Sequence, residues 1–556
     1  MKRDLKTLCS EEHDILVLGG GIYGVSVAWD AALRGLKAAL IDRGDFACAT
    51  SSNSLKTIHG GLRYLQQLDL GRMRECIRER RVLMKIAPHL VHPLPFVMPT
   101  YGHGLKSRTA LRAALFVTDL VGLDRNGLTD PVKYLPGGRT ISKEELRKLL
   151  PGYNARGMTG GALWYDCQCH NTERLALSYA LSAAKRGADL ANYVECTGFL
   201  MAADRVRGVR ARDTLTGERL AIRARVIVNA CGPWIDEVLG TLNGRRTKRI
   251  FMPSSAMNII VKRKLLEGCA TGLPSPCPNG ESRASVRRGT RILFFTPWRH
   301  YTLIGTNHLP FEGQKGTYRV TEGEIKDFLV SVNAAYPAAE IRRDEISFFH
   351  GGLVPTAGIS PTGEVRYERR CGIHDHSVEG GVEGLITVCG EKYTTHRTAA
   401  RRVVDLALRN LGRRPEGCLS DQIHLEGGDI ERFEELLREA VRTSGVTDVV
   451  ARHLVYAYGS TYRDVLEYGQ KDSSLLRTVR GSYEVIRAEV VHAVREEMAL
   501  KLSDTVLRRT GLGSGESPGE ETLREVAGIM AAELGWDASR TLSEIDETKA
   551  TYVPEG

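Results

Sequence analysis

The stretch from Asp14 to Asp42 constrains the fold more than any other part of the chain. A short apolar run, residues 14–18, is followed by Gly19-Gly20-Gly21-Ile22-Tyr23-Gly24, which places a G-x-G-x-x-G pattern on Gly19, Gly21 and Gly24. In such a turn the first glycine makes the bend, the second lets the backbone approach a diphosphate, and the third lets helix and strand pack closely. The expected helix over residues 25–34 presents its N-terminal N–H groups to that diphosphate. The sequence therefore predicts a strand, a turn and a helix that bind a dinucleotide.

An acidic residue completes this pattern. The second expected strand, residues 38–41, delivers Asp42 roughly 20 residues after Gly19, where a carboxylate can accept both hydroxyls of an adenosine ribose. An acid rather than an arginine at this place favours an unphosphorylated ribose, so NAD or FAD is preferred over NADP. These residues alone leave NAD and FAD open.

Length and charge narrow the class of protein. At 556 residues the chain is too long for one hydrophobic core, so two or three domains are expected. The formal net charge of +10 suits an anionic cofactor, an anionic substrate or an acidic membrane surface. The arginines are scattered and form no recognition motif, so nucleic acid is not an expected partner. The most apolar stretch, residues 110–123, is interrupted by Arg112 and Asp119 and is too short to span a bilayer.

The cysteines and the N-terminus indicate a cytoplasmic protein. Residues 1–14 carry charges of both signs and predict no secretory signal. The 12 cysteines are spread singly except for Cys167 and Cys169 beside His170, and reduced thiols are expected. That cluster has no second half with zinc-like spacing, so no metal site is expected.

The segment after Asp42 carries the strongest resemblance to a known family. Thr50-Ser51-Ser52, Lys56 and Ile58-His59-Gly60-Gly61-Leu62-Arg63-Tyr64-Leu65 follow neither a helical nor a strand pattern, and such a segment makes hydrogen bonds rather than core. It closely resembles the FAD-dependent glycerol-3-phosphate dehydrogenases, which belong to the wider glutathione-reductase-like and D-amino-acid-oxidase-like FAD oxidoreductases. The resemblance implies that this stretch wraps the flavin and that Arg63 and Tyr64 lie near the flavin ring and the substrate.

Two later stretches extend the resemblance. Asn229-Ala230-Cys231-Gly232-Pro233-Trp234 resembles the family's Asn-Ala-Thr-Gly-Pro-Trp turn beside the cofactor diphosphate. Gly390 and Lys392-Tyr393-Thr394-Thr395-His396-Arg397 resemble the family's Gly-Gly-Lys-Leu-Thr-Thr-Tyr-Arg, which closes over the flavin. A helix that begins there can stabilise negative charge on the reduced flavin. Because these segments have no role in NAD enzymes, the resemblance implies FAD.

The glycine turn and the resemblance together give a set of expected cofactor-binding residues: Gly19, Gly21, Gly24, Asp42, Thr50, Ser51, Ser52, Lys56, His59, Gly60, Gly61, Leu62, Ala230, Gly232, Trp234, Gly390, Lys392, Thr394 and Thr395. For catalysis, Arg63 and Lys392 are expected to stabilise charge, Tyr64 to orient the substrate, and His350 to accept a proton. A lone histidine near a turn is more often a structural residue, so both roles of His350 stay open.

The expected fold is α/β, with an FAD-binding Rossmann-like domain, an interleaved β-rich substrate cap domain and an all-helical C-terminal domain. Residues 257–262, 291–296 and 301–305 alternate in the manner of strands, and charged amphipathic patterns fill residues 420–540. The expected boundaries are 12–80, 150–240 and 355–415 for the FAD-binding domain, 81–149 and 241–354 for the cap, and 420–545 for the helical domain.

The chain departs from the family where the substrate phosphate should bind. The family's Gly-Val-Arg-Pro turn corresponds to Gly352-Leu353-Val354-Pro355, so Val354 replaces an arginine fork and offers no donor. The family's Gly-Ser-His stretch corresponds to residues 254–258, which contain no histidine. Another cation is then needed for the phosphate, and the candidates are Arg366, Arg299, Arg287 and Lys392.

The resemblance implies oxidation of sn-glycerol 3-phosphate to dihydroxyacetone phosphate, with electrons passed to a quinone or a similar acceptor. The loss of the arginine leaves open the same fold acting on another polyol phosphate, a hydroxy acid or an amine. A flavin-binding regulatory module without dehydrogenase activity is a third alternative. Contact of residues 105–122 with the inner face of the cell membrane, and a homodimer, are also left open.

Overall fold

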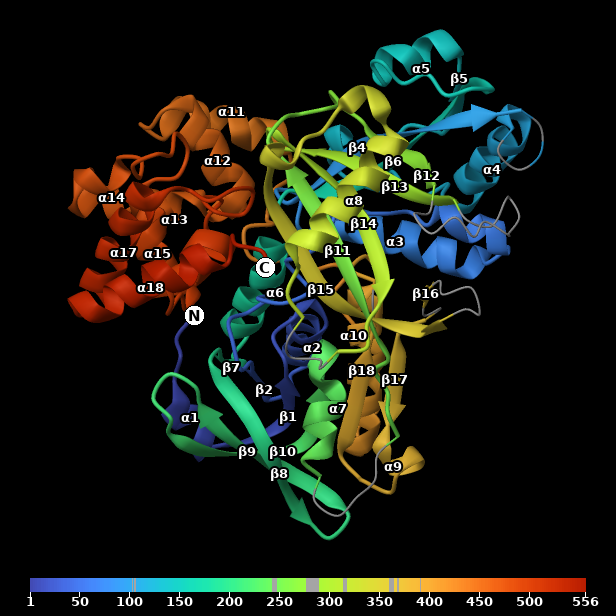
Figure 1. Cartoon of the computed structure of the whole chain (residues 1–556). Helices are drawn as coiled ribbons and strands as arrows, with labels where there is room; N and C mark the ends of the chain where they lie inside the picture. The colour runs from blue at the N-terminus through green and yellow to red at the C-terminus, as the bar shows by residue number, and fades with distance from the viewer. Residues whose placement is uncertain are drawn as a thin grey trace.

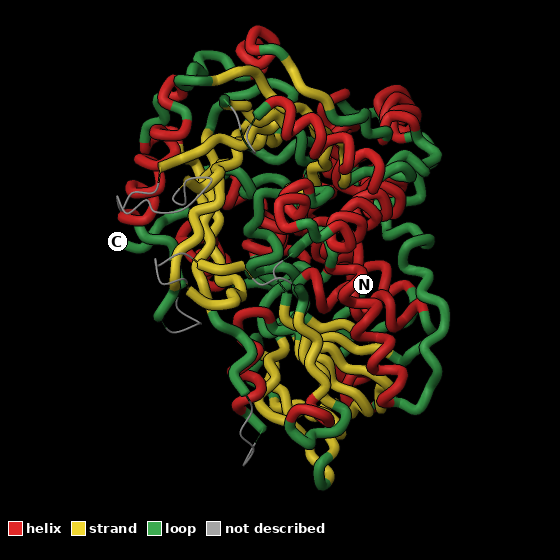
Figure 2. Tube along the Cα trace, turned by 90° about the vertical axis from the view of Figure 1, so that its right-hand side faces the viewer, coloured by secondary structure: helices red, strands yellow, loops and turns green. Residues whose placement is uncertain are grey.

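Two β-sheets and a C-terminal group of helices make up the protein (Figure 1). The computed structural model describes residues 1–102, 104, 107–242, 248–276, 290–313, 318–359, 365–367, 370–390 and 392–556. Figure 2 shows the strands of the two sheets as separate groups, with helices beside and between them.

The first sheet holds the glycine turn. Its parallel part has the order β18-β10-β1-β2-β7, and its strands are β1 (Glu12–Leu18), β2 (Ala38–Ile41), β7 (Asp189–Ala191), β10 (Arg219–Asn229) and β18 (Leu385–Cys389). Where these strands pair in parallel they are mostly buried, as expected for a sheet covered on both faces, whereas the first half of β10 alternates between exposed and buried residues. Helices α2 (Ile22–Leu33), α6 (Thr172–Lys185) and α10 (His396–Asn410) pack on one another and against it. Three antiparallel strands extend it: β8 (Val194–Ala202), β9 (Arg205–Asp213) and β17 (Gly372–Asp375).

The second sheet is mostly antiparallel and draws on segments far apart in the sequence. Its order is β16-β15-β11-β14-β13-β12-β4-β6-β3, with β5 paired to β6. Its strands are β3 (Thr57–Ile58), β4 (Val91–Tyr101), β5 (Arg139–Ile141), β6 (Met158–Cys169), β11 (Pro253–Val261), β12 (Ala270–Pro276), β13 (Thr290–Trp298), β14 (Tyr301–Pro310), β15 (Ile346–Ile359) and β16 (Val365–Tyr367). Helix α8 (Glu322–Ala335) packs against β12, and a separate apolar core fills the space between them.

Three helices lie beside the second sheet: α3 (Leu70–Ile86), α4 (Arg108–Val121) and α5 (Lys143–Leu149). The C-terminal group, red and orange in Figure 1, begins with α11 (Phe433–Thr443) and α12 (Asp448–Tyr458) and continues through α15 (Arg487–Glu497), α17 (Glu520–Leu534) and α18 (Ala538–Ala550). It has two small apolar cores of its own, which are separate from the cores of the two sheets.

Buried ion pairs provide much of that attachment. Arg174 on α6 makes two bonds of 2.8 and 2.7 Å to the Glu497 carboxylate at the end of α15, and both side chains are buried. Asp45, just after β2, accepts hydrogen bonds from Arg508 and from both Nη atoms of Arg509. Ion pairs therefore join the C-terminal helices directly to α6 and to the segment after β2 of the first sheet.

The architecture confirms the expected α/β fold with a β-rich second sheet and a helical C-terminal region. The domain boundaries stay a prediction. Three strands of the second sheet, β3, β6 and β16, lie in segments that the sequence assigned to the FAD-binding domain. In the part of the chain that the structure describes, no helix is long and apolar enough to cross a bilayer.

Candidate active site

The glycine turn between β1 and α2 has no room for side chains. Gly19 has φ +100°, and a Cβ there would lie 2.7 Å from the Ala230 carbonyl oxygen. A Cβ on Gly24 would lie 1.8 Å from the Gly19 carbonyl oxygen. Gly21 caps α2 without a side chain, so the positive end of that helix faces the turn with its backbone alone. Such a cradle of close backbone and helix N-terminus fits a diphosphate.

Asp42 lies at the carboxyl end of β2, beside that cradle. Its carboxylate accepts hydrogen bonds from the backbone N–H groups of Gly20 at 2.6 Å and Gly44 at 2.8 Å. Burial raises the pKa of Asp42 against the opposite effect of these two bonds. The two bonds hold the carboxylate beside the turn, at the edge where ligands bind in sheets of this kind.

The hydroxyl-rich run joins the glycine turn to the second sheet. Ser51 Oγ accepts a hydrogen bond of 2.9 Å from the N–H of Ile22, in the first turn of α2. Thr50 Oγ1 donates to the Leu353 carbonyl on β15 at 3.1 Å, and a Cβ on Gly352 would lie only 3.2 Å from it. Ser52 Oγ donates within the run, to the Ala49 carbonyl. The run therefore positions β15, the strand that carries Val354, against the first sheet.

Lys56 is bound inside the protein. Its ammonium lies 2.7 Å from Glu173 Oε2 at the start of α6, and both side chains are almost fully buried. The same nitrogen lies 4.9 Å from the centre of the Trp298 ring. The Lys56 side chain thus joins its own segment to the start of α6 and to the end of β13.

The turn at His59, Gly60 and Gly61 is held from both sides. The Gly60 N–H donates to Asp166 Oδ1 at 2.5 Å, and the same oxygen accepts from the buried Arg80 guanidinium. Gly61 has φ +80° and leads into the short helix η1 (Leu62–Gln67). The N–H of His59 donates to Thr394 Oγ1 at 3.3 Å, which joins this turn to the segment before α10.

Tyr64 and Lys392 meet although they are far apart in the sequence. Tyr64 is 2% exposed, and the Lys392 ammonium lies 4.5 Å from the centre of its ring. The Lys392 backbone is fixed because Tyr23 OH donates to its carbonyl at 2.9 Å. The Arg63 side chain lies outside the described residues, and Arg63 is placed here only by its backbone in η1.

The two remaining segments that the sequence predicts at the cofactor lie around residues 230–234 and 390–395. Ala230 N–H donates to the Leu18 carbonyl at 2.8 Å, and Gly232, with φ +53°, has no atom within 4 Å of its Cβ position. Trp234 lies next to the Arg43 guanidinium. A Cβ on Gly390 would overlap Tyr23, and Thr395 begins α10 without a capping side chain. The first N–H groups of α10 therefore face the segment from residue 392 to residue 395.

His350 lies in β15 and is buried. Its Nδ1 is 3.3 Å from the Ser54 carbonyl oxygen. Burial, followed by the nearby positive charge of Lys56, lowers the pKa of His350 to about 3. The imidazole is therefore neutral at pH 7, which suits a hydrogen-bond acceptor better than a store for a proton.

Val354 has a histidine among its neighbours that sequence reasoning missed. His308 on β14 pairs in register with Ala256 on β11, and its Nε2 is 2.6 Å from Ser254 Oγ. The same Ser254 hydroxyl donates to the Val354 carbonyl at 3.1 Å. Only the sheet register brings His308 to this place, because it lies about 50 residues from the expected stretch.

Of the cations suggested for the substrate phosphate, only Lys392 lies beside Tyr64 among the described residues. Arg299 is bonded to the Gly511 carbonyl and to Asn171, toward the C-terminal helices. Arg366 is exposed on β16, and Arg287 lies outside the described residues.

Comparison with known proteins shows the family of this chain. The family described as FAD dependent oxidoreductase matches residues 14–406, and the C-terminal domain of alpha-glycerophosphate oxidase matches residues 418–541. A glycerol-3-phosphate dehydrogenase of Synechocystis is 30% identical over 98% of this chain and 97% of its own length. The chain belongs to the FAD-dependent glycerol-3-phosphate dehydrogenase family.

Other members of the family agree. Glycerol-3-phosphate dehydrogenase 2 of Mycobacterium tuberculosis is 31% identical over 99% of this chain and 88% of its own length. The mitochondrial enzyme of Bos taurus is 31% identical over 97% of this chain and 73% of its own length. The crystal structure of the glycerol-3-phosphate dehydrogenase from Bacillus halodurans, complexed with FAD, shares the fold with a TM-score of 0.77 and 24% identity, over 99% of this chain and 96% of the other. The protein is an FAD-dependent oxidoreductase, and the glycine cradle and Asp42 fit that cofactor.

Proposed function

We propose that this protein oxidises the secondary alcohol of sn-glycerol 3-phosphate to dihydroxyacetone phosphate. The observation that carries the proposal is the meeting of Lys392 with the buried Tyr64 ring next to the turn at His59. Those two residues come from the motifs that resemble the family, and several relatives over nearly the whole chain are glycerol-3-phosphate dehydrogenases.

The cofactor residues are proposed from their positions. Gly19, Gly21 and Gly24 would hold the diphosphate with the end of α2, and Asp42 the adenosine ribose. The remaining residues would shape the site through the bonds described above: Thr50, Ser51, Ser52, Lys56, His59, Gly60, Gly61, Leu62, Ala230, Gly232, Trp234, Gly390, Thr394 and Thr395.

Each catalytic residue has a separate task in this mechanism. FAD, when bound, accepts the hydride from the alcohol carbon. Lys392 and Arg63 supply positive charge to the anionic donor and to the charge that develops on its oxygen. Tyr64 fixes the position of the Lys392 ammonium through its ring and orients the donor. His350, neutral at pH 7, accepts a hydrogen bond from the donor hydroxyl and releases any proton it receives to water.

A second candidate is the same chemistry on a different donor, and Val354 favours it. Val354 provides no donor group, and its neighbours Ser254 and His308 are neutral at pH 7, since burial lowers the pKa of His308 to about 4. Uncharged neighbours of this kind favour a smaller or less charged tail than phosphate, so another polyol derivative, a hydroxy acid or an amine is the alternative.

An anaerobic titration of the FAD-loaded protein with glycerol 3-phosphate tests the proposal through the visible absorbance of the flavin. Bleaching at millimolar donor or below is expected. A flavin that stays oxidised with glycerol 3-phosphate but bleaches with a hydroxy acid or an amine would favour the second candidate. A flavin that none of these donors reduces would favour a binding module.

We also propose that α4 touches a membrane surface, where a quinone could accept the electrons. Leu115 is the only side chain of α4 that is buried, whereas Phe116 and Leu120 are 64% and 50% exposed. Leu123, just beyond α4, and Leu68, at the end of η1, are 80% and 82% exposed. Such neighbouring apolar side chains are typical of an interfacial helix. Sedimentation with anionic vesicles should fall for Phe116→Ser with Leu120→Ser, and equal sedimentation would contradict the contact.

A further inference from the structure

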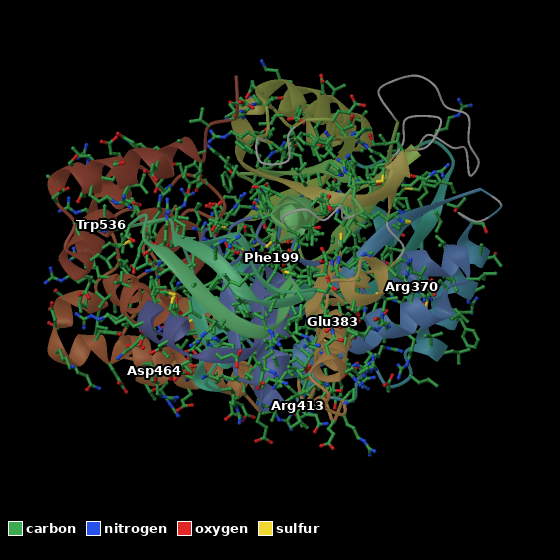
Figure 3. The ribbon with its side chains drawn as sticks, turned by 90° about the horizontal axis from the view of Figure 1, so that it is seen from below. Phe199, Arg370, Glu383, Arg413, Asp464 and Trp536 are labelled. Carbon is green, nitrogen blue, oxygen red and sulfur yellow. The ribbon has the colours of Figure 1, made fainter. Side chains whose placement is uncertain are left out.

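Two cations contact the Tyr64 ring at the donor site proposed above. The Lys392 ammonium lies 4.5 Å from the ring centre, and the Arg72 guanidinium carbon lies 4.8 Å from it. Both side chains also line one cavity of about 420 Å³ between α3 and α10, a volume typical of sites for small ligands. Figure 3 labels Arg370, another residue of the cavity wall, on the side of the molecule where α3 lies. Arg72 is thus a second cation of this site, and sequence reasoning missed it.

Close ion pairs already occupy other arginines of the cavity wall. In each pair a guanidinium nitrogen lies 2.9 Å or less from a carboxylate oxygen. The pairs are Arg74 with Asp124, Arg78 with Asp421, and Arg397 with Glu79. The charges of these arginines are therefore balanced within the chain, and they are not available to a ligand.

Arg72 is held more loosely than these arginines. Its side chain is buried, and Asp69 lies 3.5 Å from its Nε, which is longer than an ordinary hydrogen bond. The Asp69 carboxylate also caps α3, where it accepts from the backbone N–H of Arg72 at 3.1 Å. Among the described residues, neither Nε nor Nη2 of Arg72 has a hydrogen-bond partner. Buried donors that stay unpaired are costly, so this edge of the guanidinium suits an acceptor that a ligand brings.

We propose that Arg72 binds the phosphate group of the donor, a contact that Val354 cannot supply. The inference rests on the proposed function, in which the donor is glycerol 3-phosphate. A guanidinium that stacks on a tyrosine ring keeps its planar edge for two charge-assisted hydrogen bonds to phosphate oxygens. Lys392 lies at the same ring, so a dianion bound there meets two positive charges that otherwise repel each other. The phosphate then lies on the α3 side of the donor site rather than beside β15.

Steady-state kinetics of the FAD-loaded full-length protein, with a dye as the electron acceptor, test the role of Arg72. We expect Arg72→Gln to raise KM for glycerol 3-phosphate at least about tenfold, through the loss of a charged contact, and to change kcat less than about threefold. Arg72→Lys should restore part of the loss, because it keeps the charge without the planar fork. An unchanged KM in Arg72→Gln, or a lower kcat at unchanged KM, would overturn the proposal.

The matched control is Lys85→Gln, which removes a positive charge from an exposed position of α3 outside the cavity and should leave KM unchanged. Thermal unfolding and flavin absorbance establish that each variant folds and holds FAD. If Arg72→Gln loses FAD, the comparison of Arg72→Lys with the wild type decides, since loss of the fork alone should still raise KM.

Isothermal titration with inorganic phosphate separates this inference from the proposed function. The wild type should bind phosphate saturably, and Arg72→Gln should raise the dissociation constant at least about tenfold. If glycerol 3-phosphate reduces the flavin but phosphate binds equally to the wild type and Arg72→Gln, the inference about Arg72 fails alone. If glycerol 3-phosphate does not reduce the flavin, the proposed function fails, and phosphate binding that still depends on Arg72 assigns the site to another phosphate donor.

Discussion

The Asp45 carboxylate joins the C-terminal helices to the cofactor-binding sheet, and its removal should weaken both. It accepts from Arg509 Nη1 and Nη2, each at 2.7 Å, from Arg508 Nε at 2.6 Å, and from Asn192 Nδ2 at 3.0 Å. Asp45 and Arg509 are each 1% exposed. The nearby guanidinium groups of Arg509 and Arg508 hold the pKa of Asp45 well below its usual range.

The Asp45→Ala substitution removes the carboxylate that the buried Arg508 and Arg509 share. Arg508 then keeps only the Asp504 carboxylate and Arg509 the Glu497 carbonyl among the bonds described for their side chains. Breaking a buried pair in this way costs about 3–5 kcal/mol. In a cooperative unit of about 150–250 residues, each kcal/mol lowers Tm by about 2–4 °C, so we expect a decrease of about 6–20 °C. Flavin should be released in the same transition, since Asp45 lies three residues after Asp42.

Circular dichroism and flavin fluorescence, followed together during heating, measure both effects. The matched control is Asp464→Ala, since Asp464 is exposed on the C-terminal helices (Figure 3) and should change the free energy of unfolding by no more than about 0.5 kcal/mol. The double variant with Arg509→Gln should be less destabilised than the sum of the single variants. A Tm for Asp45→Ala within about 1 °C of the wild type would refute the reasoning.

Four further outcomes follow from the site. Gly24→Ala should abolish FAD binding, measured as visible absorbance after gel filtration, because a Cβ there lies 1.8 Å from a backbone oxygen; retained flavin would contradict this. Lys392→Met should lower kcat/KM about tenfold or more, since a charged contact is lost, and Lys392→Arg should restore part of it. Burial lowers the pKa of His89 to about 3 and of His396 to about 4. Below pH 6.5, their ordinary pKa, these two histidines bind protons in the unfolded chain but stay neutral in the folded protein. The free energy of unfolding should therefore fall as the pH falls, by up to about 1.4 kcal/mol per pH unit for each histidine. Urea midpoints at pH 7 and pH 5 measure this decrease. Val354→Arg should lower KM for glycerol 3-phosphate about tenfold if the phosphate lies beside β15, and an unchanged KM would place it elsewhere.

The first sheet and its glycine turn could be predicted because their signals are local. The bend at Gly19, the helix after it and the acid at Asp42 all follow from residues within one βαβ unit. The alternating strands β11, β13 and β14 were also predictable, since each pattern is contained in about ten residues.

Contacts between distant segments could not be predicted in the same way. The ion pair of Lys56 and Glu173, and the bonds of Asp45 to Arg509, join residues more than 100 positions apart. Nothing in the sequence around Arg508 and Arg509 identifies Asp45 as their partner. The expected histidine is likewise absent from residues 254–258, and the pairing of β14 with β11 brings His308 beside Ser254 instead.

The buried charges explain how a loop-rich site keeps its shape. The segments predicted at the cofactor are rich in glycine, serine and threonine, so they offer few apolar side chains for packing. The ion pairs Lys56–Glu173 and Arg80–Asp166 lie beside these loops, and Arg397–Glu79 lies at the start of α10. Such pairs add little net stability, because the cost of desolvation offsets their attraction, yet each permits one geometry only. We infer that the chain uses them to fix loop positions that apolar packing cannot fix, which is why their loss should affect flavin retention as well as Tm.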